Sequence, residues 1–207
     1  CALVFDAIHG GDGRDATARS VPFVWDATRT LASLRVGWYR SAFEQAETEA
    51  DQRRKRFDDA TLDVVRRLGA ALVPVELPAD YPLNAMRAAI LSAEAGAAFD
   101  GLTRSGRVNE IERSNWPNAF RQARFIPAVE YINANRLRTL AMQAMAEALA
   151  GIDVLVAPSF GGNVLLLTNL TGHPAVCLPN GFTDEGTPVS ISFIGRLFGE
   201  ADLLVAA

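Results

Sequence analysis

Short apolar segments that are typical of β-strands alternate along this chain with segments long enough to form helices. The strand-like segments are residues 34–40, 70–78, 152–160, 173–179 and 188–196. The last of them, PVSISFIGR, alternates strictly between outward and inward positions. This strand–helix–strand order indicates an α/β fold with a largely internal sheet. Because we find neither repeats nor a low-complexity linker, we expect a single domain over residues 1–207.

The segments between these strands carry helical patterns. Residues 42–68 form the clearest expected helix, with apolar positions broadly on one side and Gly69 as a C-terminal stop. Further helices are expected over residues 83–104 and over residues 127–151, the latter between a proline and a glycine. A polar loop is expected over residues 113–120.

Both ends of the chain are apolar and helical in pattern. CALVFDAI opens the chain with nothing before Cys1 to cap a helix, and GEADLLVAA closes it without a C-terminal signal. Helices of fewer than three turns are marginal in isolation. We therefore expect this chain to be a piece of a larger domain, cut at both ends.

The composition excludes several classes of protein. With 20 Lys+Arg against 24 Asp+Glu the net charge is -4, which does not suit a nucleic-acid-binding surface. No apolar run approaches the roughly 18 residues of a membrane span, and no signal peptide is evident. The chain's 2 cysteines cannot form a disulfide framework. We expect a reducing, cytoplasmic compartment and no membrane association.

His173 and Cys177 are the conspicuous chemical pair, in the segment NLTGHPAVCLPNGF. Flanking prolines favour a strand, on which residues four apart lie roughly 13 Å from each other. A nucleophile–base pair needs about 3 Å, so the two do not form a catalytic dyad. No metal-ligand spacing is present either, and we expect no metal site. We expect Cys177 to be a small buried apolar residue and His173 to be a hydrogen-bonding residue.

Other candidate functional residues lie elsewhere. Lys55 belongs to a charge-rich helix and is expected to be solvated rather than catalytic. The glycines of HGGDG (residues 9–13) and SFGGN (residues 159–163) match no nucleotide-binding loop, so no cofactor is expected. SFGGN directly follows a buried strand, where ligands bind in open α/β sheets. Phe160, Gly161 and Gly162 are therefore the candidate substrate-binding residues, with a simple turn as the alternative.

Three segments late in the chain share a pattern with a known family. The pattern runs D-x-L-x-x-P, then N-L-x-G-x-P-A, then P-x-G-F, then G-x-P-[VI], then [IF]-G-[RK]-x-x-x-E. The residues that match it are Asp153, Leu155, Pro158, Asn169, Leu170, Gly172, Pro174, Ala175, Pro179, Gly181, Phe182, Gly186, Pro188, Val189, Ile194, Gly195, Arg196 and Glu200. Weaker matches are ALVFDAIHGGDGRD, LRVG and EYINANRLR. The chain resembles the C-terminal half of an amidase signature enzyme, either an amidase or the A-type subunit of an amidotransferase.

This resemblance implies the fold: a mixed, largely buried β-sheet flanked by helices on both faces. It also implies that residues 1–207 are the C-terminal portion of a single amidase signature domain. The missing N-terminal half of that domain would be the main partner, and exposed core could favour homo-oligomers. Within NLTGHPAVCLPNGF, the resemblance implies that Asn169 anchors a turn, Gly172 lets backbones approach, and the strand enters the central sheet.

The resemblance further implies an amidase that hydrolyses linear carboxamides with a serine, a second serine on a cis peptide, and a lysine. In the family these residues and a Gly/Ser-rich oxyanion loop lie upstream. This chain has no GGSS-like run, and Lys55 is not in the family's lysine context. We therefore assign no catalytic residue, and we expect the chain alone to be inactive.

One residue position bears on which class of substrate the family member would use. Relatives that take glutamine commonly carry an aspartate seven residues before the Asn of N-L-x-G, where this chain has Gly162. This disfavours a glutamine-using subunit and favours a general amidase with a less polar pocket.

Two alternatives remain. One is an N-terminal-nucleophile hydrolase that uses Cys1, although such a cysteine normally begins a strand. The other is a non-catalytic scaffold or an inactive fragment.

Overall fold

The computed structural model describes residues 1–45, 48–112 and 114–207. The described chain divides into two compact units. We call them the sheet unit, which comprises Cys1–Leu77 and Met145–Ala207, and the helical unit, Pro78–Ala144.

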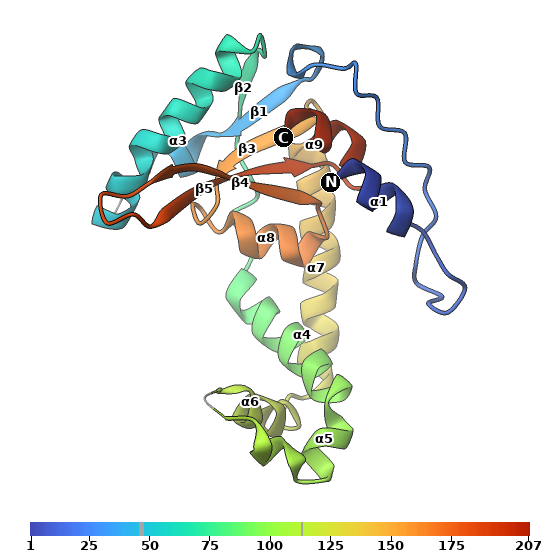
Figure 1. Ribbon diagram of the computed structural model, residues 1–207. Coiled ribbons are helices and arrows are strands. Elements are labelled where there is room, and N and C mark those ends of the chain that lie inside the picture. The colour runs from blue at the N-terminus through green and yellow to red at the C-terminus, as the bar shows by residue number, and fades with distance from the viewer. Residues whose placement is uncertain (46–47, 113) are drawn as a thin grey trace. The chain divides into compact units, whose positions relative to one another are not determined.

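The sheet unit is built on a sheet that has five strands among the described residues, in the order β2-β1-β3-β5-β4 (Figure 1). The strands are β1 (Val36–Tyr39), β2 (Leu72–Val75), β3 (Val154–Pro158), β4 (Ala175–Phe182) and β5 (Pro188–Gly195). β1 runs parallel to β2 and β3, whereas β5 runs antiparallel to β3 and β4. The predicted mixed α/β fold is confirmed.

The helices of the sheet unit are α1 (Ala2–Ile8), α2 (Arg40–Glu44), α3 (Glu49–Arg67), α8 (Val164–Thr171) and α9 (Glu200–Ala206), with a 3-10 turn at Leu31–Ser33. α3 and α9 lie against one face of the sheet and α8 against the other (Figure 1). The helical unit contains α4 (Leu83–Ala98), α5 (Asp100–Arg104), a 3-10 turn at Arg107–Glu110 and α6 (Trp116–Ala123). The long helix α7 (Ala128–Ala148) begins in the helical unit and ends in the sheet unit.

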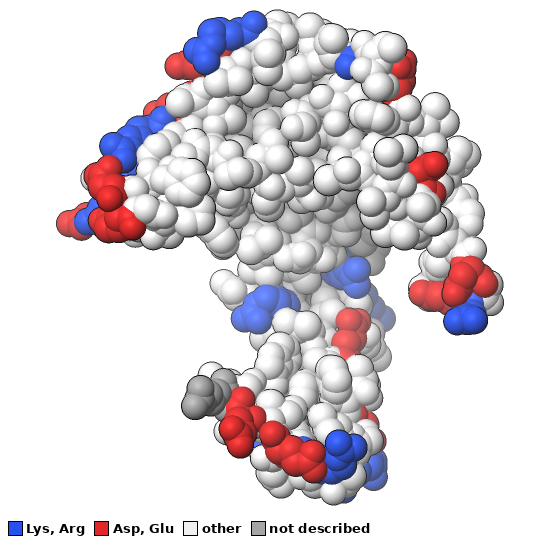
Figure 2. Space-filling model, in the orientation of Figure 1, with Lys and Arg blue, Asp and Glu red and all other residues white. Residues whose placement is uncertain are grey.

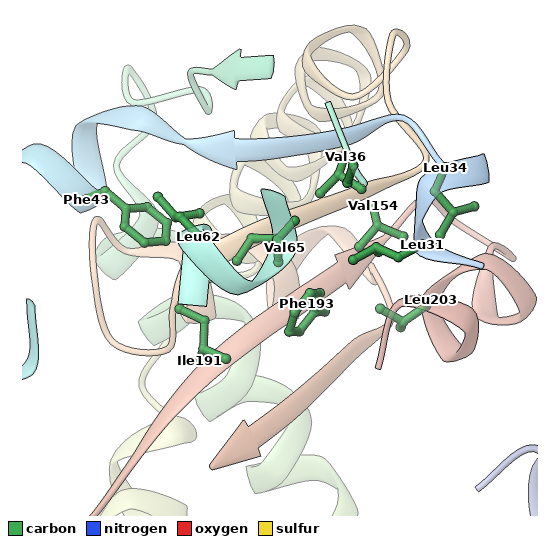
Figure 3. Packing of buried hydrophobic residues seen from close by; sticks show 12 residues of the cluster. Leu31, Leu34, Val36, Phe43, Leu62, Val65, Val154, Ile191, Phe193 and Leu203 are labelled. Carbon is green, nitrogen blue, oxygen red and sulfur yellow. The ribbon is translucent and has the colours of Figure 1, made fainter. Parts of the chain in front are cut away.

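The core of the sheet unit lies between α3, α9 and the sheet (Figure 3). Val36, Val154 and Val156 point into it from the central strands β1 and β3 and are almost completely buried. α3 contributes Leu62 and Val65. Because β-branched residues cover a pleated surface well, these valines suit both the strand conformation and the packing.

The helix predicted over residues 42–68 is two helices. α3 begins at its own cap: the Thr48 hydroxyl accepts a hydrogen bond from the Asp51 amide at 3.1 Å, and the Asp51 carboxylate accepts one from the Thr48 amide at 3.2 Å. This reciprocal pair satisfies two amides at a helix start, so a new helix begins there. Residues 46–47, inside the predicted helix, lie outside the described residues.

Two segments for which no helix was predicted are helical. Residues 116–120 of the loop predicted over 113–120 form the start of α6, where Pro117 occupies the first turn, as prolines can; residue 113 lies outside the described residues. Residues 164–171 form α8, so Asn169 lies in a helix and not in a turn. Gly172 ends α8 with a φ of 82°. Its role is this left-handed cap, since a side chain there would meet only Leu197 at 3.9 Å.

An ion-pair network explains two of the family motifs. The Asp153 carboxylate, which precedes β3, accepts hydrogen bonds from Arg35 Nη2 at 2.7 Å and from the Arg35 amide at 2.9 Å. Arg196, which follows β5, reaches the same carboxylate at 3.1 Å. The network continues from Arg196 to Asp202 of α9 at 3.7 Å. It therefore joins the ends of β1, β3 and β5 to α9.

Candidate functional site

A cleft of about 360 Å³ opens at the edge of the sheet where β3 ends. Its walls come from α2 and the first turns of α3, from the loop at residues 158–163, and from the start of β5. All of these segments belong to the sheet unit. Because β1 and β3 are parallel, their carboxyl ends meet at this edge, which is the usual ligand position in open α/β sheets.

The loop predicted as a pocket wall does line this cleft. Phe160, Gly161 and Gly162 all line it, and Phe160 is 71% exposed. Gly162 has a φ of +56°, and a Cβ there would lie 2.6 Å from the ring of Tyr39. Only glycine lets the loop follow this path so close to β1. The role of these three residues in binding a substrate stays a prediction.

Lys55 lines the same cleft but is not simply solvated, as the sequence had suggested. Its Nζ donates to the carbonyl oxygen of Phe43 and to Asp59 Oδ1, both at 2.8 Å. These contacts hold α3 against the end of α2. They leave Lys55 as an anchored cation in the wall of the cleft.

Asp58 is a buried acid that the sequence pattern did not indicate. It lines the cleft, is 6% exposed, and accepts a hydrogen bond from Asn180 Nδ2 at 2.9 Å. Burial raises the pKa of the Asp58 carboxyl, and the hydrogen bond from Asn180 only partly opposes this. The sequence contains only part of the information needed to find Asp58. Its partner Asn180 lies in the PNGF motif, but nothing in the sequence indicates that this motif contacts α3.

A chain of hydroxyl groups runs from the cleft into the sheet. Ser190 and Ser192 of β5 each donate to Ser159 Oγ, at 3.0 Å and 2.9 Å. Cys177 Sγ lies 3.3 Å from Ser192 Oγ. Ser159 and Ser190 line the cleft, while Ser192 is buried behind them. The alternation in PVSISFIGR places Ser190 and Ser192 on one side of β5, but it does not indicate that Ser159 joins them.

His173 and Cys177 contact different partners in the structure, Thr171 and Ser192. His173 is 8% exposed, and its Nδ1 lies 2.8 Å from the Thr171 hydroxyl. That hydroxyl donates to the Leu167 carbonyl, so Nδ1–H is the donor to Thr171. Burial lowers the pKa of His173. The predicted hydrogen-bonding role of His173 is confirmed.

The prediction that Cys177 is buried is wrong. Cys177 is exposed, because β4 lies at the edge of the described sheet and Cys177 points away from the core. The strand is therefore not a central one within this chain. Cys1 is also exposed, precedes α1, and is not among the described residues that line the cleft.

The described residues hold no group of three or more His, Cys, Asp and Glu side chains that could bind a metal ion. Within the part of the chain that the structure describes, none of the helices is both long and apolar enough to cross a membrane. The charges that line the cleft are balanced, with Asp51 and Asp58 opposite in sign to Arg54 and Lys55. Such a lining suits a neutral polar ligand.

The model of the family described as Amidase matches residues 1–166. The A-type subunit of the glutamyl-tRNA(Gln) amidotransferase from Neisseria gonorrhoeae (strain ATCC 700825 / FA 1090) is 24% identical over 250 residues, covering 100% of this chain and 51% of the relative. The same subunit from Azoarcus sp. (strain BH72) is 29% identical over 256 residues, covering 100% of this chain and 52% of the relative. The chain thus spans about half the length of the curated relatives it matches.

Solved structures share the fold. A bacterial aryl acylamidase of the amidase signature family has a TM-score of 0.76 at 21% identity, covering 100% of this chain and 49% of that one. The native peptide amidase from Stenotrophomonas maltophilia has a TM-score of 0.68 at 21% identity, covering 86% of this chain and 42% of that one. At these identities the likeness establishes the fold alone.

Proposed function

This chain belongs to the amidase family, and we propose that the protein containing it hydrolyses the C–N bond of a small linear carboxamide. The family match over residues 1–166 is the observation that carries the proposal. The aryl acylamidase and the peptide amidase with the same fold support amide chemistry. A cleft whose charges balance is consistent with an uncharged amide as substrate.

The catalytic residues of this proposal lie outside the chain. The resemblance implies a serine nucleophile, a second serine on a cis peptide and a proton-relaying lysine, in a segment upstream of residue 1. The serine would attack the amide carbonyl while donors stabilise the oxyanion, and the lysine relay would pass the serine proton to the nitrogen as the C–N bond breaks and the amine leaves. Water would then hydrolyse the acyl-enzyme, which releases the carboxylic acid and restores the serine. Lys55 is a poor substitute for the relay lysine, because its Nζ is held by Phe43 and Asp59.

The cleft would form one side of the substrate pocket. Phe160 offers an exposed aromatic surface to an apolar substituent of the amide, and Gly161 and Gly162 let backbone and ligand approach each other. The rest of the domain would close the pocket from the other side.

Glutamine is disfavoured as the substrate, although the curated relatives include amidotransferase subunits. The resemblance places an ammonium-binding aspartate at the position of Gly162 in glutamine-using relatives. A Cβ at Gly162 would collide with the ring of Tyr39. An acidic side chain there would have to displace the Tyr39 ring and adopt a positive φ that strains residues with a Cβ.

The remainder of the amidase signature domain is the partner we propose for the sheet unit. None of the residues of α1, all of which the structure describes, is buried, and Leu3 and Ile8 are 84% and 73% exposed. The middle of the sheet unit's face in Figure 2 is largely uncharged, with charges along α3 on one side and on the N-terminal segment on the other. Exposed apolar surface of this kind favours association, so the isolated chain should form homo-oligomers in light-scattering experiments. A cytoplasmic location is proposed as well, since both cysteines are free thiols.

Hydrolysis of 4-nitroacetanilide tests the proposed function. We expect the natural protein that contains residues 1–207 to release 4-nitroaniline, and the purified 207-residue chain to release none above the uncatalysed rate. Changing Cys1 to Ala in the natural protein should leave turnover unaltered. If the natural protein hydrolyses no carboxamide, the proposed function is wrong; a large loss from the Cys1 change would instead favour the N-terminal-nucleophile alternative.

A further inference from the structure

We propose that the Ser159 hydroxyl is an additional hydrogen-bond donor to the carbonyl oxygen of the amide substrate, beside the donors of the upstream oxyanion loop. This inference rests on the proposed function and deepens it, because it assigns a specificity-determining residue to the cleft.

The first step is the position of Ser159. It follows β3 directly and is 7% exposed, yet it contributes to the wall of the cleft beside Phe160. β3 and β5 are antiparallel, with Pro158 opposite Ile191, so Ser190 and Ser192 flank Ser159 on the same side of the sheet. The sheet itself therefore holds the three hydroxyls together.

The second step is the count of hydrogens. A serine hydroxyl has one hydrogen to donate and two lone pairs to accept with. Ser190 and Ser192 both donate to Ser159 Oγ, which fills both lone pairs. Among the described residues, no acceptor takes the hydrogen of Ser159 itself. Cys177 can donate its thiol hydrogen to Ser192 and so reinforce this direction along the chain.

The third step is the kind of ligand. With both lone pairs filled, Ser159 cannot accept a hydrogen bond from a ligand, so its partner must be an acceptor. A buried donor without a partner costs about 1–3 kcal/mol, which a ligand oxygen in the cleft would offset. The neighbouring wall, with Phe160 and Pro158, is apolar, and the lining charges balance. These features select a neutral carbonyl oxygen attached to an apolar group.

Acetanilide and N-ethylaniline make a matched pair of probes of similar size, because N-ethylaniline has a CH2 group and an amine where acetanilide has its carbonyl group and an amide. Binding to the natural protein that contains residues 1–207 is measured, with the probe in excess, by shifts of the backbone amide resonances of Phe160, Gly161 and Gly162. The variants are Ser159→Ala and, as a control within the same hydroxyl chain, Ser192→Ala. Ser159→Cys, whose thiol is a weak donor, replaces Ser159→Ala if that variant does not fold.

We expect Ser159→Ala to weaken acetanilide binding by about tenfold, as for one lost hydrogen bond to a neutral acceptor. N-ethylaniline should bind wild type and Ser159→Ala equally. Ser192→Ala should weaken acetanilide binding by less than about threefold, because the donor of Ser159 remains.

Acetanilide that binds folded Ser159→Ala as tightly as wild type overturns this inference and leaves the proposed function standing. An equal loss from Ser192→Ala also overturns it, because the role of Ser159 would then be structural. If wild type binds neither probe in the cleft, the assignment of the cleft to amide substrates fails together with the inference.

Discussion

Changing Gly181 to alanine should strongly destabilise the sheet unit. Gly181 lies in β4, just after an irregularity in its pairing with β5. A Cβ at this position would lie 2.5 Å from Cε1 and 2.8 Å from Cγ of Phe57 on α3, and closer still to Cδ1. The glycine in the P-x-G-F motif is therefore the point where α3 packs directly against the β4–β5 pair.

The size of the expected destabilisation by Gly181→Ala follows from these distances. Carbon atoms in contact prefer a separation of about 3.5–4.0 Å, so the added methyl group overlaps the ring. Cγ is fixed close to the backbone of α3, and rotation of the ring cannot remove the overlap. Overpacking typically costs about 1–3 kcal/mol, and we expect a loss of about 3 kcal/mol in the free energy of unfolding.

Urea denaturation followed by tryptophan fluorescence measures this loss. A Trp116→Phe background removes the tryptophan of the helical unit, so that the two remaining tryptophans, Trp25 and Trp38, report on the sheet unit. Gly151→Ala is the matched control, because no described atom lies within 4 Å of its added Cβ. We expect the control to change stability by less than about 0.5 kcal/mol.

A double-mutant cycle tests the physical cause. In a Phe57→Ala background the ring is gone, and Gly181→Ala should cost less than about 1 kcal/mol, a coupling of about 2 kcal/mol. An equal cost in both backgrounds would refute the steric reasoning. The cost would then have to come from the backbone of β4 itself.

Three further predictions concern single side chains, each measured by urea denaturation. The hydrogen bond from Arg35 is the main cause that lowers the pKa of Asp153 below 3.8, so its stabilisation is present above pH 3.8 and lost as the pH falls through the folded-state pKa. Asp153→Asn should lower the free energy of unfolding by about 2 kcal/mol at pH 7 and should make it less dependent on pH in the acid range. An unchanged dependence on pH in that range would contradict the proposed role of the ion-pair network. Burial raises the pKa of Asp58 above 3.8, so its contribution is present below pH 3.8 and lost as the pH rises. Asp58→Asn should therefore raise stability at pH 7, and a decrease there would show that the charge is needed. Cys177→Ser should change stability by less than about 0.5 kcal/mol, because Cys177 is exposed; a larger loss would place it in a buried strand after all.

The secondary structure was largely predictable from local pattern. All five predicted strands exist, because each is an apolar run bounded by residues that stop a strand or a helix. The errors lie where a short polar signal was overlooked. The Thr48–Asp51 capping box divides a predicted helix, and α8 forms where Asn169 was expected to anchor a turn.

Only the location of the candidate site was predictable from the sequence, and not all of its residues. The position after a buried strand indicated Phe160, Gly161 and Gly162, and these residues do line a cleft. Asp58 and Ser159 were missed. Their partners lie far along the chain, 122 residues away for the pair Asp58–Asn180 and 31 residues away for the pair Ser159–Ser190.

The sequence by itself determined the α/β class, the family, and the elements of the chain, since helix periods, strand alternation and glycine stops act over a few residues. Only the tertiary structure decided that β4 lies at the edge of the described sheet, which exposes Cys177. It also decided that β5 lies between β3 and β4, which brings Ser190 and Ser192 to Ser159. Strand order and register depend on contacts between distant segments, and a local pattern does not specify which distant strand will be the neighbour.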